Sequence, residues 1–385
     1  MDQLTYRDYN SVLYIDLAEL RRNAERILAA LEPQTTLIPV LKDDAYGLGL
    51  IELARVYAGM ERVPYIAVAH VSEGLLLRRA GIQTPILVMG SPLPFQLAAA
   101  VQAELTLTVG RVGSLSEIDK IAFEKKQYAS IHVKIETGLH RIGVRPGDEL
   151  AAVIDEYRAA KNVRLTGTYS HFSDGDSAGQ CRLQYDRFQA ALEQLSAAGI
   201  APGLRHISAS AALERNPQYT LDAVRIGRRL YMDHPTQPDG GVRELASWRT
   251  YITAINELAA GETLGYSGAY TLPRDTTVAV LGVGYGDGLD MRLPQAQAPV
   301  LIRGCECPLL CCCMDQAFAD VTGLDCCVGD EVTIFGYDRA GNFLSAQAQS
   351  NRIHGNEGCG FTSALTARVA RVYESSETIK EYVTA

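Results

Sequence analysis

Apolar and polar positions follow two alternating periods over the first 240 residues or so. Residues 17–31 place leucine, isoleucine and alanine on one helical face, which predicts an amphipathic helix with Asp16 as its N-cap. Further helical stretches are expected at 71–80, 92–104, 148–161 and 181–198. Eight short apolar runs alternate with the helical segments: the run that ends at Lys42, then "PYIAVAH", "PILVMG", "LTLTVG", "ASIHVKIE", "VRLTGTYSHF", "LRHISAS" and "AVRIG". Near-continuous apolar strands between helices are typical of a parallel sheet, and eight such units close a (β/α)₈ barrel of the TIM type.

The pattern changes from about Trp248. Runs such as "TYITAINEL", "TTVAVLGVGYGDG", "PVLIRGCECPLL", "DEVTIFGY" and "LTARVARVY" are broken by Gly, Pro and Asp and show little helical periodicity. The predicted fold class is therefore α/β, with a barrel domain over 1–245 and a mostly β C-terminal domain over 246–385. The alternative that the first strand packs with the second domain stays open.

Bulk properties narrow the class of partner. The chain carries a net charge of -9 with a pI of about 5.4, and no run of Lys and Arg stands out. Nucleic acid and anionic membranes are therefore poor candidates, and a small ligand is favoured. The start, "MDQLTYRDYN", lacks the features of a signal peptide, and no apolar segment reaches the ~18 residues of a membrane span. We expect a cytoplasmic protein.

The chain has nine cysteines, many of them between Cys305 and Cys327. A zinc site would need two pairs of thiols separated by two to four residues, whereas adjacent cysteines point to opposite sides of a strand. No metal site is expected. Buried small apolar side chains in a reducing compartment are the favoured interpretation.

Reactive side chains stand where the predicted strands end. Lys42 closes the first of the eight strands, Lys134 lies near the end of the fifth, His171 near the end of the sixth, Ser210 just past the seventh and Gly227 just past the eighth. Active sites of such barrels lie at this face, so the five residues are expected to converge.

The loops after strands seven and eight, "HISASAALE" and "VRIGRRLY", suit a phosphate, because they offer a hydroxyl, backbone N–H groups and a helix N-terminus. A lysine opposite a phosphate suggests a Schiff base to pyridoxal phosphate, since a desolvated lysine can lose its proton and attack a carbonyl. Pyridoxal phosphate is the predicted cofactor.

Eight motifs together resemble the alanine racemase family: "VLKDDAYGLG", "VKIETGLHRIGV", "YSHFSDGD", "RHISASAA", "VRIGRRLY", "LGYSGAY", "GVGYGDG" and "CMDQ", in this order. The resemblance spans nearly the whole chain. It implies a two-base, pyridoxal phosphate-dependent racemase that interconverts L- and D-alanine, with serine as a second candidate substrate. It also implies a homodimer in which the partner chain completes each active site.

The resemblance implies a role for each matching residue. Lys42 and Tyr266 are the two catalytic bases, with Tyr266 supplied by the partner. The cofactor contacts are Lys42, Tyr46, His171, Ser210, Arg225, Gly227 and Arg228. The substrate carboxylate is held by Arg141 and the backbone N–H of Met314. The supporting residues are Lys134, His206, Tyr285 and Asp315, of which Lys134 matches a lysine that is often carbamylated.

These roles fit the chemistry of racemisation. The α-proton leaves from one face of the substrate and a proton returns to the other, which favours a separate acid–base group on each side. An arginine beside the pyridine nitrogen scarcely gives up a proton, so that nitrogen stays unprotonated and transamination is disfavoured.

Packing alternatives remain open for several of these residues. Tyr266 and Tyr285 lie in glycine-rich β stretches, where a tyrosine is often a half-buried packing residue. His206 fits a structural histidine as well. Lys134 has Glu136 and Asp148 as alternative surface partners.

The sequence departs from the family's pattern at four positions, Asp43, Leu48, Ala209 and Ala367. Ala209 removes a polar contact to the cofactor, and Ala367 replaces a phenol beside Tyr285, which would widen the entrance and admit serine. A serine-preferring or broad-specificity racemase is therefore an alternative. A same-fold decarboxylase, a pyridoxal phosphate carrier and a degenerate binding module are further rivals.

Overall fold

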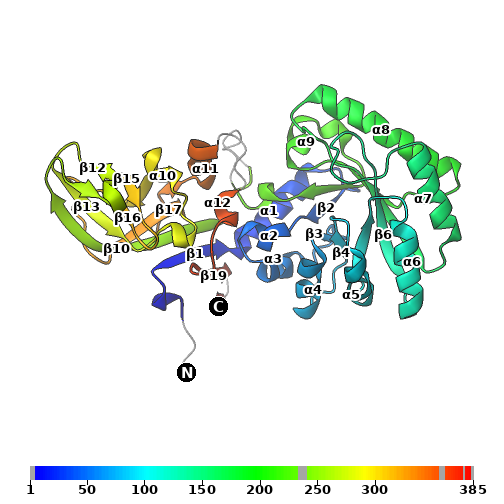
Figure 1. Cartoon of the computed structure of the whole chain (residues 1–385), viewed down its shortest axis with the longest axis horizontal. Helices are drawn as coiled ribbons and strands as arrows, with labels where there is room; N and C mark the ends of the chain where they lie inside the picture. Colours follow the sequence, from blue (N-terminus) through cyan, green and yellow to red (C-terminus); the bar gives the residue numbers. More distant parts are fainter. Residues whose placement is uncertain (1–4, 233–240, 355–359, 376–377, 383–385) are drawn as a thin grey trace. The chain divides into compact units, whose positions relative to one another are not determined.

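The computed structural model describes residues 5–232, 241–354, 360–375 and 378–382, and it forms two compact units (Figure 1). The barrel unit comprises Ala24–Ala45 and Leu50–Leu230, and the β unit comprises Met1–Asn23, Tyr46–Gly49 and Tyr231–Ala385. Helix α1 (Leu17–Ala30) crosses the boundary between them. Glu19 N donates to Asp16 Oδ1 over 2.8 Å, so the predicted N-cap is confirmed.

The barrel unit contains the eight predicted strands. Their bounds are β2 (Thr36–Pro39), β3 (Ile66–Val68), β4 (Ile86–Val88), β5 (Thr106–Val109), β6 (Ala129–Lys134), β7 (Val163–Tyr169), β8 (Leu204–His206) and β9 (Ala223–Ile226). Strands β3 to β8 form one parallel sheet, and β2 pairs in parallel with β9. A parallel bridge from Val40 to Ala67 joins β2 to β3, and Arg225 N donates to Ser208 O between β9 and β8. The eight described strands therefore close into a barrel, as predicted.

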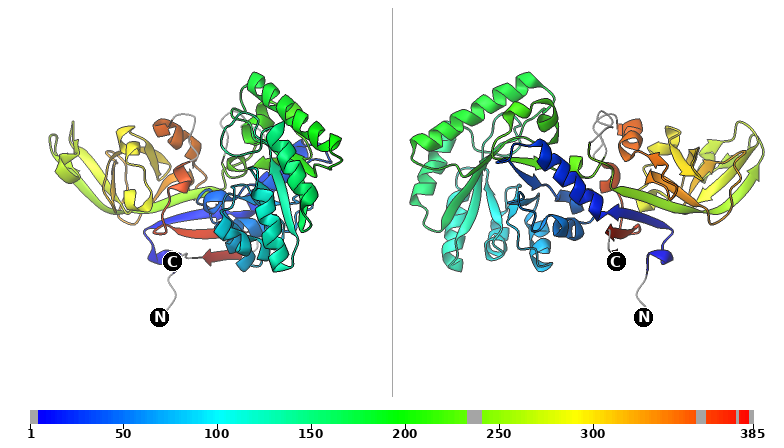
Figure 2. Two further views of the ribbon diagram at one scale, coloured as in Figure 1. Left: turned by 45° about the vertical axis from the view of Figure 1, so that its right-hand side comes forward. Right: turned by 180° about the vertical axis from the view of Figure 1, so that it is seen from behind.

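Helices alternate with these strands and lie outside them (Figures 1 and 2). They are α3 (Leu50–Tyr57), α4 (Val71–Arg79), α5 (Leu97–Gln102), α6 (Ser114–Lys125), α7 (Asp148–Ala159), α8 (Ala178–Ala197) and α9 (Ser210–Arg215). The helix expected over 92–104 begins as a 3₁₀ turn, Pro94–Gln96, with the proline at its first position. Ile38, Val40, Ala67, Leu87 and Ala223 form one buried cluster, which draws on the strands that close the barrel.

The β unit is built on one large, mostly antiparallel sheet. Its strands are β1 (Ser11–Asp16), β10 (Ala246–Leu258), β13 (Thr276–Leu281), β14 (Pro299–Ile302), β15 (Cys305–Cys312), β16 (Ala317–Asp320), β17 (Glu331–Tyr337), β18 (Phe343–Leu344), β19 (Ala370–Ser375) and β20 (Thr378–Tyr382). Because β17 also pairs with β10, the strands from β10 through β13, β16, β15 and β14 to β17 close a ring.

Strand β1 pairs with β10 and β19, so the first strand of the chain belongs to this sheet. Shorter elements of the unit are β11 (Thr263–Leu264), β12 (Tyr270–Thr271), α10 (Arg292–Gln295), α11 (Ala346–His354) and α12 (Gly360–Ser363). The predicted fold class, a (β/α)₈ barrel followed by a mostly β region, is confirmed. Within the described ranges, no helix is both long and apolar enough to cross a bilayer.

Candidate active site

Lys42 begins a turn of left-handed backbone directly after the first barrel strand. Asp43, Asp44 and Ala45 have φ of 58°, 50° and 54°, and Tyr46 follows at 59°. Left-handed backbone costs roughly 1–2 kcal/mol per non-glycine residue, so the turn needs support. Asp43 N donates to Glu73 Oε1 over 2.7 Å, and Leu50 N donates to Asp44 Oδ1 over 2.8 Å. These bonds hold the backbone that carries Lys42.

Four basic side chains lie close enough to His171 to affect its charge. Burial and then the positive charges of Arg225, Arg141, Lys134 and Lys42 lower the pKa of His171 well below its ordinary value. The ring is therefore neutral at neutral pH. The structure brings together these five residues, which the sequence placed on separate strands or their loops.

Arg225 is fully enclosed and fixes two histidine rings. Its Nη1 donates to His206 Nδ1 over 2.7 Å and its Nη2 donates to His171 Nδ1 over 2.8 Å. Its remaining bonds go from the same two nitrogens to the carbonyl oxygens of Ser170, His206 and Ile207. Because both rings accept at Nδ1, each carries its proton on Nε2. None of the Arg225 bonds within the described ranges uses Nε, which leaves that N–H for a ligand.

His206 forms a hydrogen bond with a third histidine ring, that of His132. Burial, with the charges of Arg225 and His132, lowers the pKa of His206, so this ring is neutral as well. Its Nε2 lies 3.1 Å from His132 Nδ1, and its face stacks on Tyr169 at 4.9 Å between centroids. His206 is therefore packed as a structural histidine would be, and the same contacts hold Arg225 in place.

Lys134 is buried and forms no ion pair with the described residues. Its Nζ lies 5.5 Å from the centroid of the Tyr169 ring. Burial first, and then the charges of Arg141 and Arg225, lower the pKa of Lys134 to about 7. The alternative pairing with Glu136 or Asp148 is not observed. At neutral pH a large fraction of this amine is therefore unprotonated, the form in which an amine is nucleophilic.

The predicted phosphate loops lie on neighbouring strands. Helix α9 begins at Ser210, where Ala209 occupies the N-cap position without a side-chain bond. Gly227 follows β9 and precedes a 3₁₀ turn that starts at Arg228. First-turn N–H groups of a helix have no acceptor within it, so both loops can present donors at the same edge of the barrel.

The remaining site residues belong to the β unit. Tyr266 begins the 3₁₀ turn Tyr266–Gly268 and is 77% exposed, between Gly265 and Ser267 with φ of 73° and 57°. Tyr46 is buried, and its ring lies 5.5 Å from that of Tyr231.

Tyr285, Met314 and Asp315 lie together in the β unit. Tyr285 N donates to Cys313 O over 3.0 Å, and Gly286 N donates to Met314 O over 2.9 Å. The N–H of Met314 has no acceptor among the described residues, which leaves it for a ligand. The eight described cysteines are free thiols.

Sequence reasoning missed several residues that support these groups. Glu73 holds the Lys42 turn, His132 holds His206, and Asp287 with Arg368 ties the Tyr285 turn to Asp315. Ala367 lies in the turn before β19 and is exposed. Of these residues, only Asp287 could have been suspected from the sequence, because it is a polar residue in the glycine-rich stretch "GVGYGDG".

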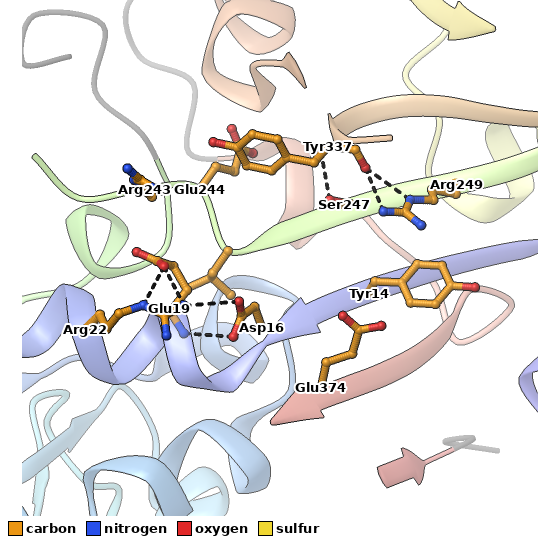
Figure 3. Close-up of a pocket in the computed structure, with 11 residues that line it drawn as sticks. Tyr14, Asp16, Glu19, Arg22, Arg243, Glu244, Ser247, Arg249, Tyr337 and Glu374 are labelled. Atoms are coloured by element: carbon orange, nitrogen blue, oxygen red, sulfur yellow. Dashed lines mark hydrogen bonds and ion pairs between the residues drawn. The ribbon is translucent and has the colours of Figure 1, made fainter. Parts of the chain in front are cut away.

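A further pocket of about 340 Å³ lies in the β unit between β1, β10 and β19 (Figure 3). Its lining is polar and carries paired charges, including Arg22 with Glu19 and Arg249 with Glu331 nearby. None of the predicted site residues lines it, so it is not the candidate active site.

The fold and the cation-rich strand ends define a (β/α)₈-barrel enzyme with a C-terminal β region. Two family models match the chain, "Alanine racemase, N-terminal domain" over residues 15–235 and "Alanine racemase, C-terminal domain" over residues 245–373. The chain belongs to the alanine racemase family, and it is an isomerase.

Curated relatives and solved structures agree with the family models. An alanine racemase of Desulfovibrio desulfuricans is 34% identical over 329 residues, covering 84% of this chain and 88% of that protein. One of Desulfosudis oleivorans is 32% identical, covering 95% of this chain and 97% of that protein. The structure of alanine racemase from Clostridium difficile 630 has a TM-score of 0.87 at 30% identity and covers 98% of both chains. That from Bacillus anthracis, with bound L-Ala-P, has a TM-score of 0.88 at 26% identity and covers 97% of both.

Proposed function

We propose that the protein is a pyridoxal phosphate-dependent racemase that interconverts L- and D-alanine and also accepts serine. The observation that carries the proposal is the enclosed Arg225, whose Nε–H is left for a ligand beside Lys42, His171 and Lys134. The residues present fit the cofactor: Lys42 would be the amine that binds its aldehyde, and Arg225 Nε would be the donor for its ring nitrogen. Ser210, Gly227 and Arg228 offer donors for its phosphate, with Tyr46 as a further contact.

The proposed chemistry needs an acidified α-C–H bond and two bases. Pyridoxal phosphate, when bound, supplies an electron sink that acidifies the α-C–H bond of an amino acid. Lys42 and Tyr266 exchange protons with opposite faces of that carbon, so the product has the inverted configuration. The Nε2–H of His171 is the proposed hydrogen-bond donor to the phenolic oxygen of Tyr266.

A homodimer is part of the proposal, with Tyr266 acting at the partner's Lys42. The 77% exposure of Tyr266 and the exposure of Met314 support it, because both side chains would be covered by a partner. A cytoplasmic location, expected from the sequence, also stays part of the proposal.

Substrate orientation is assigned to Arg141 and Met314. The guanidinium of Arg141 makes no hydrogen bond or ion pair with the described residues, and the N–H of Met314 is unbonded there, so both can bind a carboxylate. A carbamate on Lys134 would be an anion that steadies Arg141. A decarboxylase would have to release the carboxylate that these donors retain, so it is not favoured.

Ala367 is the reason that serine is proposed as a second substrate. The side chain at this position is a methyl group in an exposed turn. The family pattern has a phenol there beside Tyr285, so the smaller side chain would leave room for a hydroxymethyl group. A pocket discriminates by about 1–3 kcal/mol per methylene, so both substrates are expected to turn over.

Racemisation of L-alanine and L-serine by the purified holoenzyme, followed by chiral chromatography, tests this function. Lys42→Ala and Tyr266→Phe should each abolish turnover, while the Tyr266→Phe variant keeps its coloured cofactor. Tyr128→Phe is the matched control, because Tyr128 is an exposed tyrosine just before β6, at the opposite end of that strand from Lys134. Unchanged turnover in Tyr266→Phe would contradict the two-base assignment.

A further inference from the structure

Three segments of the β unit meet at the side chain of Arg368. Its Nε donates to Asp287 Oδ1 over 2.9 Å, and its Nη2 donates to Asp315 Oδ1 over 2.6 Å. Asp287 ends the 3₁₀ turn Tyr285–Asp287, and Asp315 belongs to the loop after β15. One guanidinium therefore joins the turn, the loop and the chain just before β19.

The two carboxylates differ in burial. The side chain of Asp287 is only 6% exposed, and its Oδ2 also accepts the N–H of Gly284 over 2.8 Å. A buried carboxylate requires hydrogen-bonded partners, so the contact from Arg368 matters for this turn. Asp315 is 60% exposed, and an ion pair so exposed contributes little to stability. Its contact instead restricts where the loop can lie.

Close backbone packing transmits this restraint to Met314. A Cβ on Gly284 would lie 2.2 Å from Met314 O, so only glycine allows the turn to approach the loop this closely. Gly286 N donates to Met314 O and Thr366 Oγ1 donates to Gly286 O, the latter over 2.9 Å. Tyr285 N also donates to Cys313 O, the carbonyl of the peptide that carries the Met314 N–H. Any movement of the turn against the loop therefore reorients both peptides of Met314, together with Tyr285.

We infer that Arg368 is a positioning residue of the substrate-binding loop. Through Asp287 and Asp315 it sets the direction of the Met314 N–H and the place of Tyr285 at the entrance. The inference rests on the proposed function, which assigns the substrate carboxylate to that N–H. Arg368 with Asp287 and Asp315 is called the clamp below. Arg368 directly follows Ala367, so the clamp also fixes the segment that carries Ala367.

Steady-state kinetics of the holoenzyme test the inference. Arg368→Gln should raise KM for L-alanine about tenfold and change kcat by less than about threefold, because the clamp orients the substrate without exchanging protons with it. Arg368→Lys should recover part of the loss, since one ammonium cannot reach both carboxylates in the planar geometry of a guanidinium. Equal losses in kcat and in kcat/KM, with KM unchanged, would overturn it.

Arg303→Gln is the matched control. Arg303 lies in the same unit with a similar exposure, and it also pairs with two carboxylates, Asp330 at 2.8 Å and Asp325 at 4.0 Å. Its removal should leave KM unchanged. If it raises KM as much as Arg368→Gln does, the effect is not specific to the clamp and the inference fails.

Hydrogen exchange provides a measurement that does not depend on racemisation. Backbone amides of residues 284–288 and 313–316 should exchange faster in Arg368→Gln than in Arg303→Gln. Inactive wild-type protein would refute the proposed function while this comparison still decides whether the clamp exists. If Arg368→Gln fails to fold, Asp315→Asn provides a second test, because it removes only the exposed ion pair with Arg368. This variant should raise KM by a smaller factor and leave the thermal stability unchanged. An unchanged KM in that variant would overturn the inference.

Discussion

Nη2 of Arg225 donates a hydrogen bond to Nδ1 of His171 over 2.8 Å, and this bond decides which nitrogen of the ring carries a proton. A guanidinium has donors only, so Nδ1 must accept and Nε2 must bear the hydrogen. The low pKa of His171, caused by burial and by Arg225 itself, keeps the ring neutral. In the proposed mechanism, the resulting Nε2–H donates a hydrogen bond to the phenolic oxygen of Tyr266.

Replacing Arg225 by lysine should therefore damage both stability and catalysis. An ammonium cannot bond both rings and the carbonyl groups at once, and each buried acceptor left unbonded costs about 1–3 kcal/mol of unfolding free energy. Urea denaturation measures the loss. Arg205→Lys is the control, because Arg205 pairs with Asp222 at 2.6 Å in a partly exposed position on β8. Equal losses in both variants would contradict the assigned role.

Lys134 should make the unfolding free energy depend on pH. Its pKa is about 7 in the folded chain and near 10.5 when unfolded. Between these values Lys134 is protonated in the unfolded chain and neutral in the folded one, so the free energy of unfolding rises with pH. The cost of burying the charged amine is felt in full below pH 7. In buffer free of carbon dioxide, Lys134→Met should be more stable than the wild type at pH 7 by up to a few kcal/mol, on the order expected for such a shift. The difference should shrink towards pH 10; a difference that is constant from pH 7 to 10 would contradict the low pKa.

The turn after Lys42 should not tolerate a side chain at Gly49. Gly49 has φ of 102°, and an added Cβ would lie 1.8 Å from the hydroxyl of Tyr373. That hydroxyl donates to Leu48 O over 3.0 Å, so it cannot move without losing its bond. Gly59→Ala is the control, because Gly59 has φ of 88° with no atom within 4 Å of the added Cβ. Gly49→Ala should lower the unfolding free energy by about 1–3 kcal/mol more than the control does. Equal losses in the two variants would mean that the positive φ alone causes the loss at Gly49, and would contradict the role of the contact with Tyr373.

Much of the fold could be predicted from the sequence because parallel strands buried on both faces leave continuous apolar runs. This is why all eight strand positions could be predicted. Lys42 was expected to close the first strand, but that strand ends at Pro39 and Lys42 begins the turn that follows. The left-handed backbone from Asp43 to Tyr46 could not, because four non-glycine residues adopt it and only Gly47 and Gly49 hint at it. It depends on Glu73, which is 30 positions away from Asp43.

Contacts between segments that are distant in the sequence could not be predicted either. The pair Arg368 and Asp287 is separated by 81 positions, and charge alone does not say which arginine meets which carboxylate. The pKa of Lys134 is another example, since it depends on burial, on the nearby Arg141 and on Arg225 from a different strand.

Mixing two inactive variants should restore activity if the partner completes the site. Lys42→Ala keeps Tyr266, and Tyr266→Phe keeps Lys42, so a mixed dimer contains one intact pair. Statistical exchange between C₂ dimers should return about a quarter of wild-type activity. Chiral analysis after co-refolding measures it, and each variant mixed with itself is the control. No recovery, in preparations where mass spectrometry shows that mixed dimers have formed, would place both bases in one chain.

The central claim is that Lys42 carries pyridoxal phosphate in the barrel unit. Borohydride reduction of the coloured holoenzyme, followed by digestion and peptide mass mapping, tests it most directly. The account predicts a pyridoxyl group on the peptide that contains Lys42. A label on another lysine, or a colourless protein that takes up no pyridoxal phosphate when supplied with it, would contradict the account.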